Sequence, residues 1–328
     1  MSLVHQYTEK HPVVWKAGYV LAIVCPGQGS QTPGFLAPWL ELPPVAGHLA
    51  ALSDIAGIDL AAHGTTSDEE TIKDTAVAQP LIVAAGLVAA QSLFDVELGT
   101  LPVILAGHSV GEITASALAG VLTESEAMTF VRERANGMAA AAAATPTGMS
   151  AVVGGNPAEV LAAIEGFGLT PANVNGAGQT VAAGTLEQLK ALAENPPAKA
   201  RVIPLKVAGA FHTSHMSPAV AALQALRPTL HPRDPQVPLL SNFDGAEVTD
   251  GGAAVDSLIA QVSRPVRWDR CMETLVQRRV TGVIELAPAG TLAGLAKRGM
   301  PGVKTVTVKT PDDLPAALAL FAELEGQA

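Results

Sequence analysis

Short apolar runs alternate along the chain with amphipathic or longer apolar segments, a pattern that predicts buried strands separated by helices. Two runs, 20–25 and 103–106, decide the architecture, because each is followed by a glycine-rich turn and then by a helical pattern. Further strands are expected at 237–241, 280–286 and 303–308, the last of them at a sheet edge. The main helices are expected at 81–93, 127–144, 257–262, 266–277, 292–298 and 314–324.

The order of elements changes between residues 147 and 208. There the chain reads β-α-β-β-α-β, which is the order of a ferredoxin-like unit. Its strands are expected at 149–153, 172–174, 180–183 and 201–207, and its helices at 157–164 and 186–193. The predicted fold class is therefore α/β, with an α/β-hydrolase-like larger domain around a parallel sheet and an inserted ferredoxin-like α+β domain. The larger domain would comprise 20–146 and 209–328, the insert 147–208, and an N-terminal extension 1–19.

Composition narrows the class of protein. A chain of 328 residues with 48% hydrophobic content can bury a sizeable core, and only 4% aromatic residues means that Ala, Val, Leu and Ile must build it. The net charge of −10 argues against nucleic acid as a partner, and an acidic partner would need a local basic patch. The two cysteines, Cys25 and Cys271, form neither a disulfide framework nor a metal set, and they fit a reducing cytosol.

The N-terminal region offers an alternative interpretation, in which Cys25 ends a signal peptide as a lipidation cysteine. Lys16 interrupts the apolar run, and Val24 is not the small residue that such a cleavage site needs. A buried strand is the better interpretation. No apolar run approaches the roughly 20 residues of a membrane span, so a cytoplasmic protein without a membrane partner is expected.

The segment Gly-His-Ser-Val-Gly at 107–111 carries the clearest chemical signal. It lies between a predicted strand and a predicted helix, which is the context of a nucleophile elbow. The glycines allow a tight turn that holds the Ser109 hydroxyl clear of the sheet, at the positive end of the helix. The N–H of Val110 would face a developing oxyanion. Taken alone, the motif could also be a simple Gly/Ser turn.

One arginine lies on the apolar side of a predicted helix. Ala127, Val131 and Met138 form an apolar stripe at helical spacing, and Arg134 falls on it, whereas Arg132 points to the far side. An inward arginine needs an anion, which can be a substrate or a structural partner in the core.

A histidine follows the last strand of the small unit, where two domains would meet. His212 is well placed there to act as a base, with His215 and His231 as competitors that position alone does not exclude. The glycine-rich loop at 26–31 also follows a strand, where open α/β sheets bind ligands, although it can equally be a tight turn. It lacks the Lys-Ser/Thr pair of a phosphate-binding P-loop.

Together these motifs resemble those of the malonyl-CoA:acyl carrier protein transacylases of dissociated fatty-acid synthesis, and those of polyketide synthase acyltransferase domains. The likeness covers about residues 20–310. It depends on the joint order of several segments: Pro-Gly-Gln-Gly-Ser-Gln at 26–31, Gln-Pro at 79–80, Gly-His-Ser-Val-Gly-Glu at 107–112, Asn-Val-Asn at 173–175, Gly-Ala-Phe-His at 209–212, Pro-Val-Arg-Trp at 265–268 and Lys-Arg at 297–298.

The resemblance implies a role for each matching residue. Ser109 would be acylated, with His212 as its base and the backbone carbonyl of Gln261 orienting the ring. Arg134 would pair with the malonyl carboxylate, although the family commonly has Gly directly after this arginine and the alignment can slip to Arg132. The remaining implied site residues are Gln28 and Val110 as backbone oxyanion donors and Phe211, Asn173 and Asn175 in the substrate pocket.

The implied activity is transfer of malonyl from malonyl-CoA to the phosphopantetheine thiol of acyl carrier protein, through a malonyl-serine intermediate. It needs no bound cofactor or metal, and the family expectation is a monomer. The acidic carrier would dock transiently on a basic patch, either Lys199 with Arg201 or Lys297 with Arg298 and Lys304. Two rival functions use the same fold: ester or thioester hydrolysis, and carrier docking without catalysis.

Overall fold

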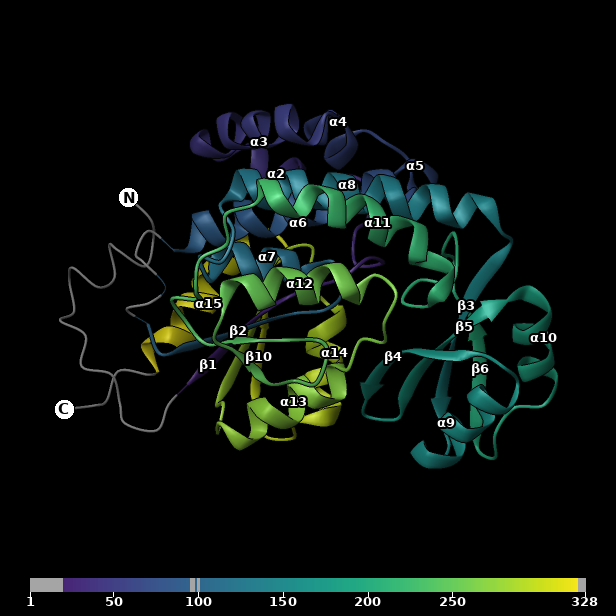
Figure 1. Ribbon diagram of the computed structural model, residues 1–328. Helices are drawn as coiled ribbons and strands as arrows, with labels where there is room; N and C mark the ends of the chain where they lie inside the picture. The colour runs from purple at the N-terminus through teal and green to yellow at the C-terminus, as the bar shows by residue number, and fades with distance from the viewer. Residues whose placement is uncertain (1–19, 95–97, 99–100, 324–328) are drawn as a thin grey trace.

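The structure is a computed structural model that describes residues 20–94, 98 and 101–323 (Figure 1). Its larger sheet has the strand order β10-β9-β1-β2-β7-β8, in which all pairs are parallel except β7 with β8. The strands are β1 (Leu21–Cys25), β2 (Val103–Gly107), β7 (Leu239–Leu240), β8 (Glu247–Val248), β9 (Gly282–Glu285) and β10 (Lys304–Thr307). The expected parallel sheet is confirmed, and β10 lies at its edge as predicted.

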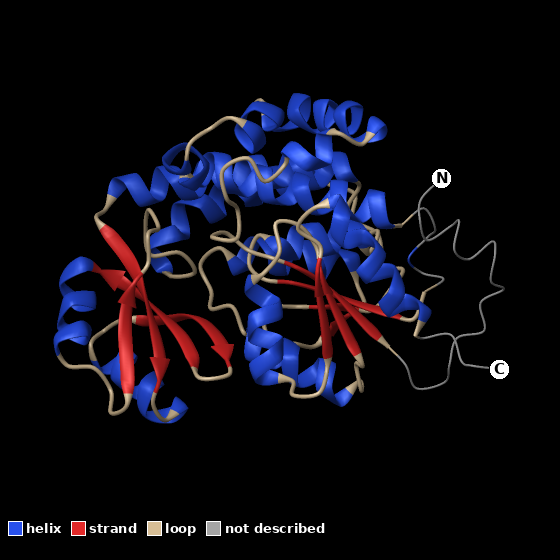
Figure 2. Ribbon diagram, turned by 180° about the vertical axis from the view of Figure 1, so that it is seen from behind, coloured by secondary structure: helices blue, strands red, loops and turns tan. Residues whose placement is uncertain are grey.

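Helices pack on both faces of this sheet (Figures 1 and 2). One face is covered by the apolar cluster that includes α6 (Thr75–Leu93), α7 (Gly111–Leu118), α8 (Glu124–Ala144) and α12 (Gly251–Gln261). The other face packs on α13 (Trp268–Gln277) and α14 (Thr291–Gly299). The remaining α-helices of the larger part are α2 (Ala37–Leu40), α3 (Pro43–Ala56), α4 (Leu60–Thr65), α5 (Glu69–Lys73), α11 (Ser217–Leu226) and α15 (Leu314–Ala322).

The position of β1 between two helical layers explains why all of its residues are apolar. Leu21 and Ile23 belong to the core on the α6 side, whereas Ala22 and Val24 belong to the core on the α13 side. Successive side chains of a strand point to opposite faces, so a central strand between two helical layers has no polar face.

The second sheet has four antiparallel strands in the order β4-β5-β3-β6 (Figure 2). Its elements are β3 (Thr147–Gly154), α9 (Pro157–Gly166), β4 (Thr170–Gly176), β5 (Gln179–Thr185), α10 (Leu186–Glu194) and β6 (Ala200–Pro204). The two helices share with the strands a separate small core that includes Val152, Ile164 and Leu192. This topology confirms the predicted mixed fold class, while the exact domain division at 147 and 208 stays a prediction.

Some sequence expectations need correction. Helix α6 begins at Thr75 and not at 81, because the side chain of Asp74 accepts a hydrogen bond from the Ala76 N–H and the helix continues through Pro80. A proline inside a helix removes one backbone hydrogen bond, and burial of the surrounding turns compensates for that loss. The sequence pattern also missed α11 and the two-residue strand β8.

The expectation that no apolar run approaches a membrane span was also wrong. Helix α6 has 19 residues and includes an 18-residue stretch with a mean hydropathy of 1.6, so its length and composition would allow it to cross a membrane. Of this stretch, 78% is buried inside the structure, which makes α6 a core helix. The predicted extension 1–19 lies outside the described residues.

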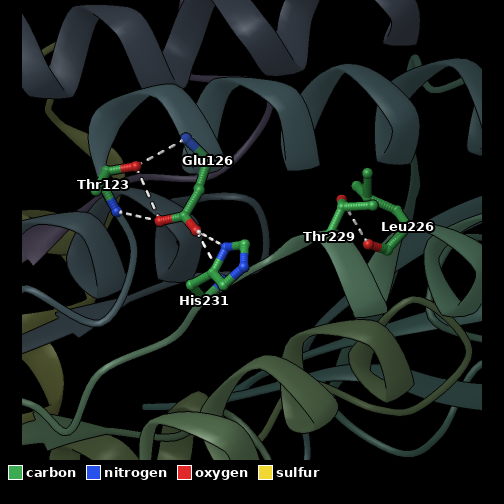
Figure 3. A network of polar contacts seen from close by, with 5 residues as sticks. All are labelled: Thr123, Glu126, Leu226, Thr229 and His231. Carbon is green, nitrogen blue, oxygen red and sulfur yellow. Dashed lines mark hydrogen bonds and ion pairs between the residues drawn. The ribbon is translucent and has the colours of Figure 1, made fainter.

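The start of α8 has a capping box (Figure 3). The Glu126 N–H donates to Thr123 Oγ1 at 3.2 Å, and the Thr123 N–H donates to Glu126 Oε2 at 2.9 Å. The same carboxylate accepts the backbone N–H of His231 at 2.8 Å, which attaches the segment after α11 to the start of α8. A nearby turn is closed by the Thr229 hydroxyl, which donates to the Leu226 carbonyl at 2.8 Å.

We expect Thr123→Ala to lower the free energy of unfolding by about 1 kcal/mol, because one backbone N–H of the first turn loses its partner. Urea unfolding followed by circular dichroism measures the change. Thr123→Ser keeps the hydroxyl and should stay close to wild type. Equal stability of the alanine variant and wild type would contradict the capping role.

Candidate active site

Ser109 lies in a strained turn between β2 and α7, with a φ of 54°. The two flanking glycines permit the close approach that this turn needs. A Cβ on Gly107 would lie 2.1 Å from the carbonyl oxygen of Gly111, and one on Gly111 would lie 2.1 Å from that of Cys25. Larger residues are excluded at both positions, so the geometry is that of a nucleophile elbow.

The hydroxyl of Ser109 meets the imidazole of His212, with 2.7 Å between Oγ and Nε2. The other ring nitrogen, Nδ1, lies 2.8 Å from the backbone carbonyl oxygen of Gln261. Because a carbonyl oxygen only accepts, Nδ1 must carry the proton, and Nε2 is left free to accept the proton of the serine. Ser109, His212 and Gln261 are thus brought together as the resemblance implied.

His212 is only 3% exposed and has a φ of 61°, so its loop holds the ring in one place. Burial, reinforced by the positive charge of Arg134, lowers the pKa of His212 to about 3. The competing histidines do not reach the serine: His215 is half-buried in a short 3-10 helix, and His231 is exposed beside Glu126 (Figure 3).

The stripe that singled out Arg134 predicted its direction correctly, since the residue is only 1% exposed. Its Nη1 donates to Gln79 Oε1 at 2.5 Å, and its Nη2 donates to Gln261 Oε1 at 2.9 Å. Nη2 also lies 3.3 Å from Ser109 Oγ. The alternative, Arg132, instead donates to the carbonyl of Ile55 at 2.7 Å.

The guanidinium of Arg134 is not fully hydrogen-bonded. Its Nε is buried and has no hydrogen-bond partner among the described residues. Burial lowers the pKa of Arg134 to about 10, although the nearby Glu112 carboxylate opposes that effect, so the group stays charged at neutral pH. A buried cation beside a nucleophile has the chemistry to bind the anionic end of an acyl group.

Sequence reasoning missed two residues that support the elbow. Asn242 Oδ1 accepts the Ser109 N–H at 2.8 Å, and Asn242 Nδ2 donates to the Gly107 carbonyl at 2.6 Å. Glu112 is 4% exposed, and burial raises its pKa to about 7. Asn242 could have been found by its place directly after the predicted strand 237–241, because the carboxyl ends of parallel strands meet at one sheet edge.

The two proposed oxyanion donors line the same pocket as Ser109. Gln28 belongs to the loop after β1, and Val110 follows the serine. The backbone N–H of neither residue is hydrogen-bonded within the described part of the chain, so both can bind an oxyanion. The loop approaches the elbow closely, since a Cβ on Gly27 would lie 2.8 Å from the His108 carbonyl oxygen.

The pocket has a volume of about 230 Å³ and lies between the two sheets. The predicted pocket residues Asn173, Asn175 and Phe211 all line it. Asn175 also joins the sheets, because its Oδ1 lies 2.8 Å from His108 Nε2. The expectation that no metal takes part stays a prediction; among residues 20–94, 98 and 101–323 no His, Cys, Asp and Glu side chains cluster as a metal site.

Comparison with known proteins identifies the family to which this geometry belongs. The family described as acyl transferase domain matches residues 22–310. The chain belongs to the acyl transferase family. The malonyl CoA-acyl carrier protein transacylase of Mycobacterium tuberculosis is 53% identical over 296 residues, which are 90% of this chain and 98% of that protein. The enzyme of the same name from Escherichia coli K12 is 32% identical over 307 residues, which are 91% and 99% of the two chains.

Solved structures agree with this membership. The crystal structure of MCAT from Mycobacterium tuberculosis has a TM-score of 0.88 and 51% identity, and covers 94% of this acyl transferase and 100% of that chain. A type II PKS acyl-carrier protein in complex with its malonyl-transacylase gives a TM-score of 0.85 and 29% identity, with 92% and 99% covered. The resemblance drawn from the motifs is confirmed.

The basic patches of this acyl transferase remain candidates for carrier docking. Lys199, Arg201, Lys297 and Arg298 are all exposed. Lys304 is also exposed, but its ammonium pairs with the carboxylate of Glu323.

Because the pKa of His212 is low, the acylation rate should fall on acidification only at a pH far below the pKa of a free imidazole. Only the neutral ring accepts the Ser109 proton, so lowering the pKa from 6.5 to about 3 should leave the acylation rate at pH 5 close to that at pH 7. The burst of 4-nitrophenol from 4-nitrophenyl acetate measures this rate.

Arg134→Gln should move the acid midpoint upward, because it removes the positive charge that opposes protonation of His212. Arg132→Gln removes a charge from the same helix at a distance from the ring, and serves as the control that keeps the wild-type midpoint. A wild-type midpoint near 6.5 would show that His212 is not held in its neutral form.

Proposed function

We propose that this acyl transferase moves malonyl groups from malonyl-CoA to the phosphopantetheine thiol of acyl carrier protein and so supplies extender units for fatty-acid synthesis. One observation carries the proposal: Ser109 Oγ lies 2.7 Å from His212 Nε2 and 3.3 Å from the buried guanidinium of Arg134. A nucleophile, its base and a cation for a second carboxylate thus share one pocket. The names of the relatives support the same substrates.

In the first half of the cycle, His212 takes the Ser109 proton as Oγ attacks the thioester carbonyl. The oxyanion is bound by the N–H groups of Gln28 and Val110, each contributing about 3 kcal/mol. The carbon–sulfur bond then breaks, His212 returns the proton to the sulfur of CoA, and malonyl-Ser109 remains.

The second half reverses these steps with a different thiol. The pantetheine thiol of the carrier gives its proton to His212, and its sulfur attacks the malonyl-serine ester. Ser109 leaves as an alcohol with the proton that His212 held. Because CoA departs before the carrier reacts, the kinetics should be ping-pong.

Arg134 provides the selectivity. The carboxylate of a malonyl group on Ser109 can form a bidentate, charge-assisted pair with the guanidinium, while an acetyl group leaves it buried without an anion. This cation also argues against hydrolysis of neutral esters, which has no use for it. A docking scaffold without catalysis would have no need for the hydrogen bond between Ser109 and His212.

Incubation with malonyl-CoA followed by intact mass measurement distinguishes these functions. We expect a stable malonyl adduct on wild-type enzyme and none on Ser109→Ala, because only the serine oxygen carries the acyl group. Free malonate with CoA would instead support hydrolysis, and an unchanged mass with no CoA released would support the scaffold.

We expect Arg134→Ala to reduce malonyl transfer by at least about a hundredfold and to raise the relative rate of acetyl transfer, because the carboxylate loses its charge-assisted partner. Transfer from malonyl-CoA and acetyl-CoA to carrier protein is measured side by side. Arg132→Ala, a matched change two residues away on the same helix, should retain the wild-type preference. Unchanged malonyl preference in Arg134→Ala would exclude the carboxylate-binding role.

A further inference from the structure

One buried carboxylate near the nucleophile has no part in the mechanism described above. Glu112 lies in the first turn of α7 and is 4% exposed. Its Oε1 accepts the backbone N–H of Asn242 at 3.0 Å, and its Oε2 accepts a hydrogen bond from Gln261 Nε2. It makes no ion pair with Arg134 or any other cation among the described residues.

The side chain of Gln261 lies between this carboxylate and Arg134. Its Oε1 accepts from Arg134 Nη2 at 2.9 Å, while its Nε2 faces Glu112 and also lies 3.2 Å from the Ser109 carbonyl oxygen. The backbone carbonyl of the same residue accepts from His212 Nδ1 at 2.8 Å. One residue therefore contacts the base, the nucleophile and the cation.

Donor and acceptor chemistry allows only one orientation of this amide. A guanidinium only donates and an ionised carboxylate only accepts, so the amide must turn its oxygen to Arg134 and its nitrogen to Glu112. We propose that Glu112 is a positioning residue for malonyl selectivity, which fixes the Gln261 amide so that its oxygen faces Arg134. The inference rests on the proposed function.

The amide also keeps two opposite charges apart. Arg134 is held by two neutral oxygens, from Gln79 at 2.5 Å and from Gln261 at 2.9 Å. A carboxylate in direct contact would bind the guanidinium bidentately and compete with the substrate. With a neutral amide between them, Glu112 orients the site while the charge of Arg134 remains available to the malonyl carboxylate.

Replacement of Glu112 by glutamine tests this role with little change in volume. The new amide must point its nitrogen at the Asn242 N–H or at Gln261 Nε2, and both of these are donors. The clash of donors displaces Gln261, either directly or through Asn242, whose Oδ1 lies 3.3 Å from Gln261 Nε2. The guanidinium of Arg134 then loses its well-placed acceptor. We expect the ratio of malonyl-CoA to acetyl-CoA rate constants for Ser109 acylation to fall at least about tenfold.

The assay follows adduct formation by intact mass at pH 8, above the Glu112 pKa of about 7. Glu133→Gln, which removes a half-exposed carboxylate paired with Arg132, is the matched control and should keep the wild-type ratio. Thermal unfolding of each variant separates a loss of selectivity from a loss of fold. If wild type itself shows no malonyl preference, the proposed function fails; if wild type prefers malonyl and Glu112→Gln does so equally, only this inference fails.

A double variant tests whether Glu112 affects malonyl selectivity through Arg134. In the Arg134→Ala background, Glu112→Gln should change the malonyl to acetyl ratio by less than about twofold, because the group that it positions is absent. An equal fall in both backgrounds would overturn the inference. If Glu112→Gln does not fold, Gln261→Met takes its place: it removes the amide but keeps the carbonyl that orients His212, and a wild-type ratio in that variant would likewise overturn the inference.

Discussion

The buried guanidinium of Arg134 is the interaction on which the arrangement of the site depends. A charge that is 1% exposed is costly unless its donors are bonded, and no described carboxylate forms an ion pair with it. Two glutamine side chains supply the acceptors instead, Gln79 from α6 and Gln261 from the end of α12. Three helices from distant parts of the sequence must therefore converge beside Ser109, and their packing keeps the cation in place without neutralising it.

The same cation explains why a backbone carbonyl orients His212. A carboxylate at Nδ1 would raise the pKa of the ring and would also attract the neighbouring guanidinium away from the acyl pocket. The Gln261 carbonyl selects the tautomer through one hydrogen bond of 2.8 Å and adds no net charge. Burial and Arg134 then keep the imidazole neutral, which is the form that can accept a proton.

The sequence predicts much of the fold, at the positions where local sequence preferences agree with the tertiary structure. The apolar run of β1 and the glycines around Ser109 each predict their local geometry. Helical spacing alone distinguishes Arg134 from Arg132. The failures have a common cause. Helix α6 runs through Pro80 because tertiary burial outweighs one lost hydrogen bond, and the roles of Glu112 and Asn242 depend on elements that meet only after folding.

The hydrogen bonds that join the two sheets have a consequence for engineering. Backbone hydrogen bonds of 2.9 Å join Val266 to the β4 segment on both sides of Asn173, and Asn175 bonds the ring of His108, the residue that precedes the nucleophile. A rotation of the four-stranded unit would therefore strain contacts that lie next to Ser109. A chimera with a different four-stranded unit, made to accept a larger acyl group, must keep these junction contacts. Without them, a wider pocket would be accompanied by a misplaced Ser109.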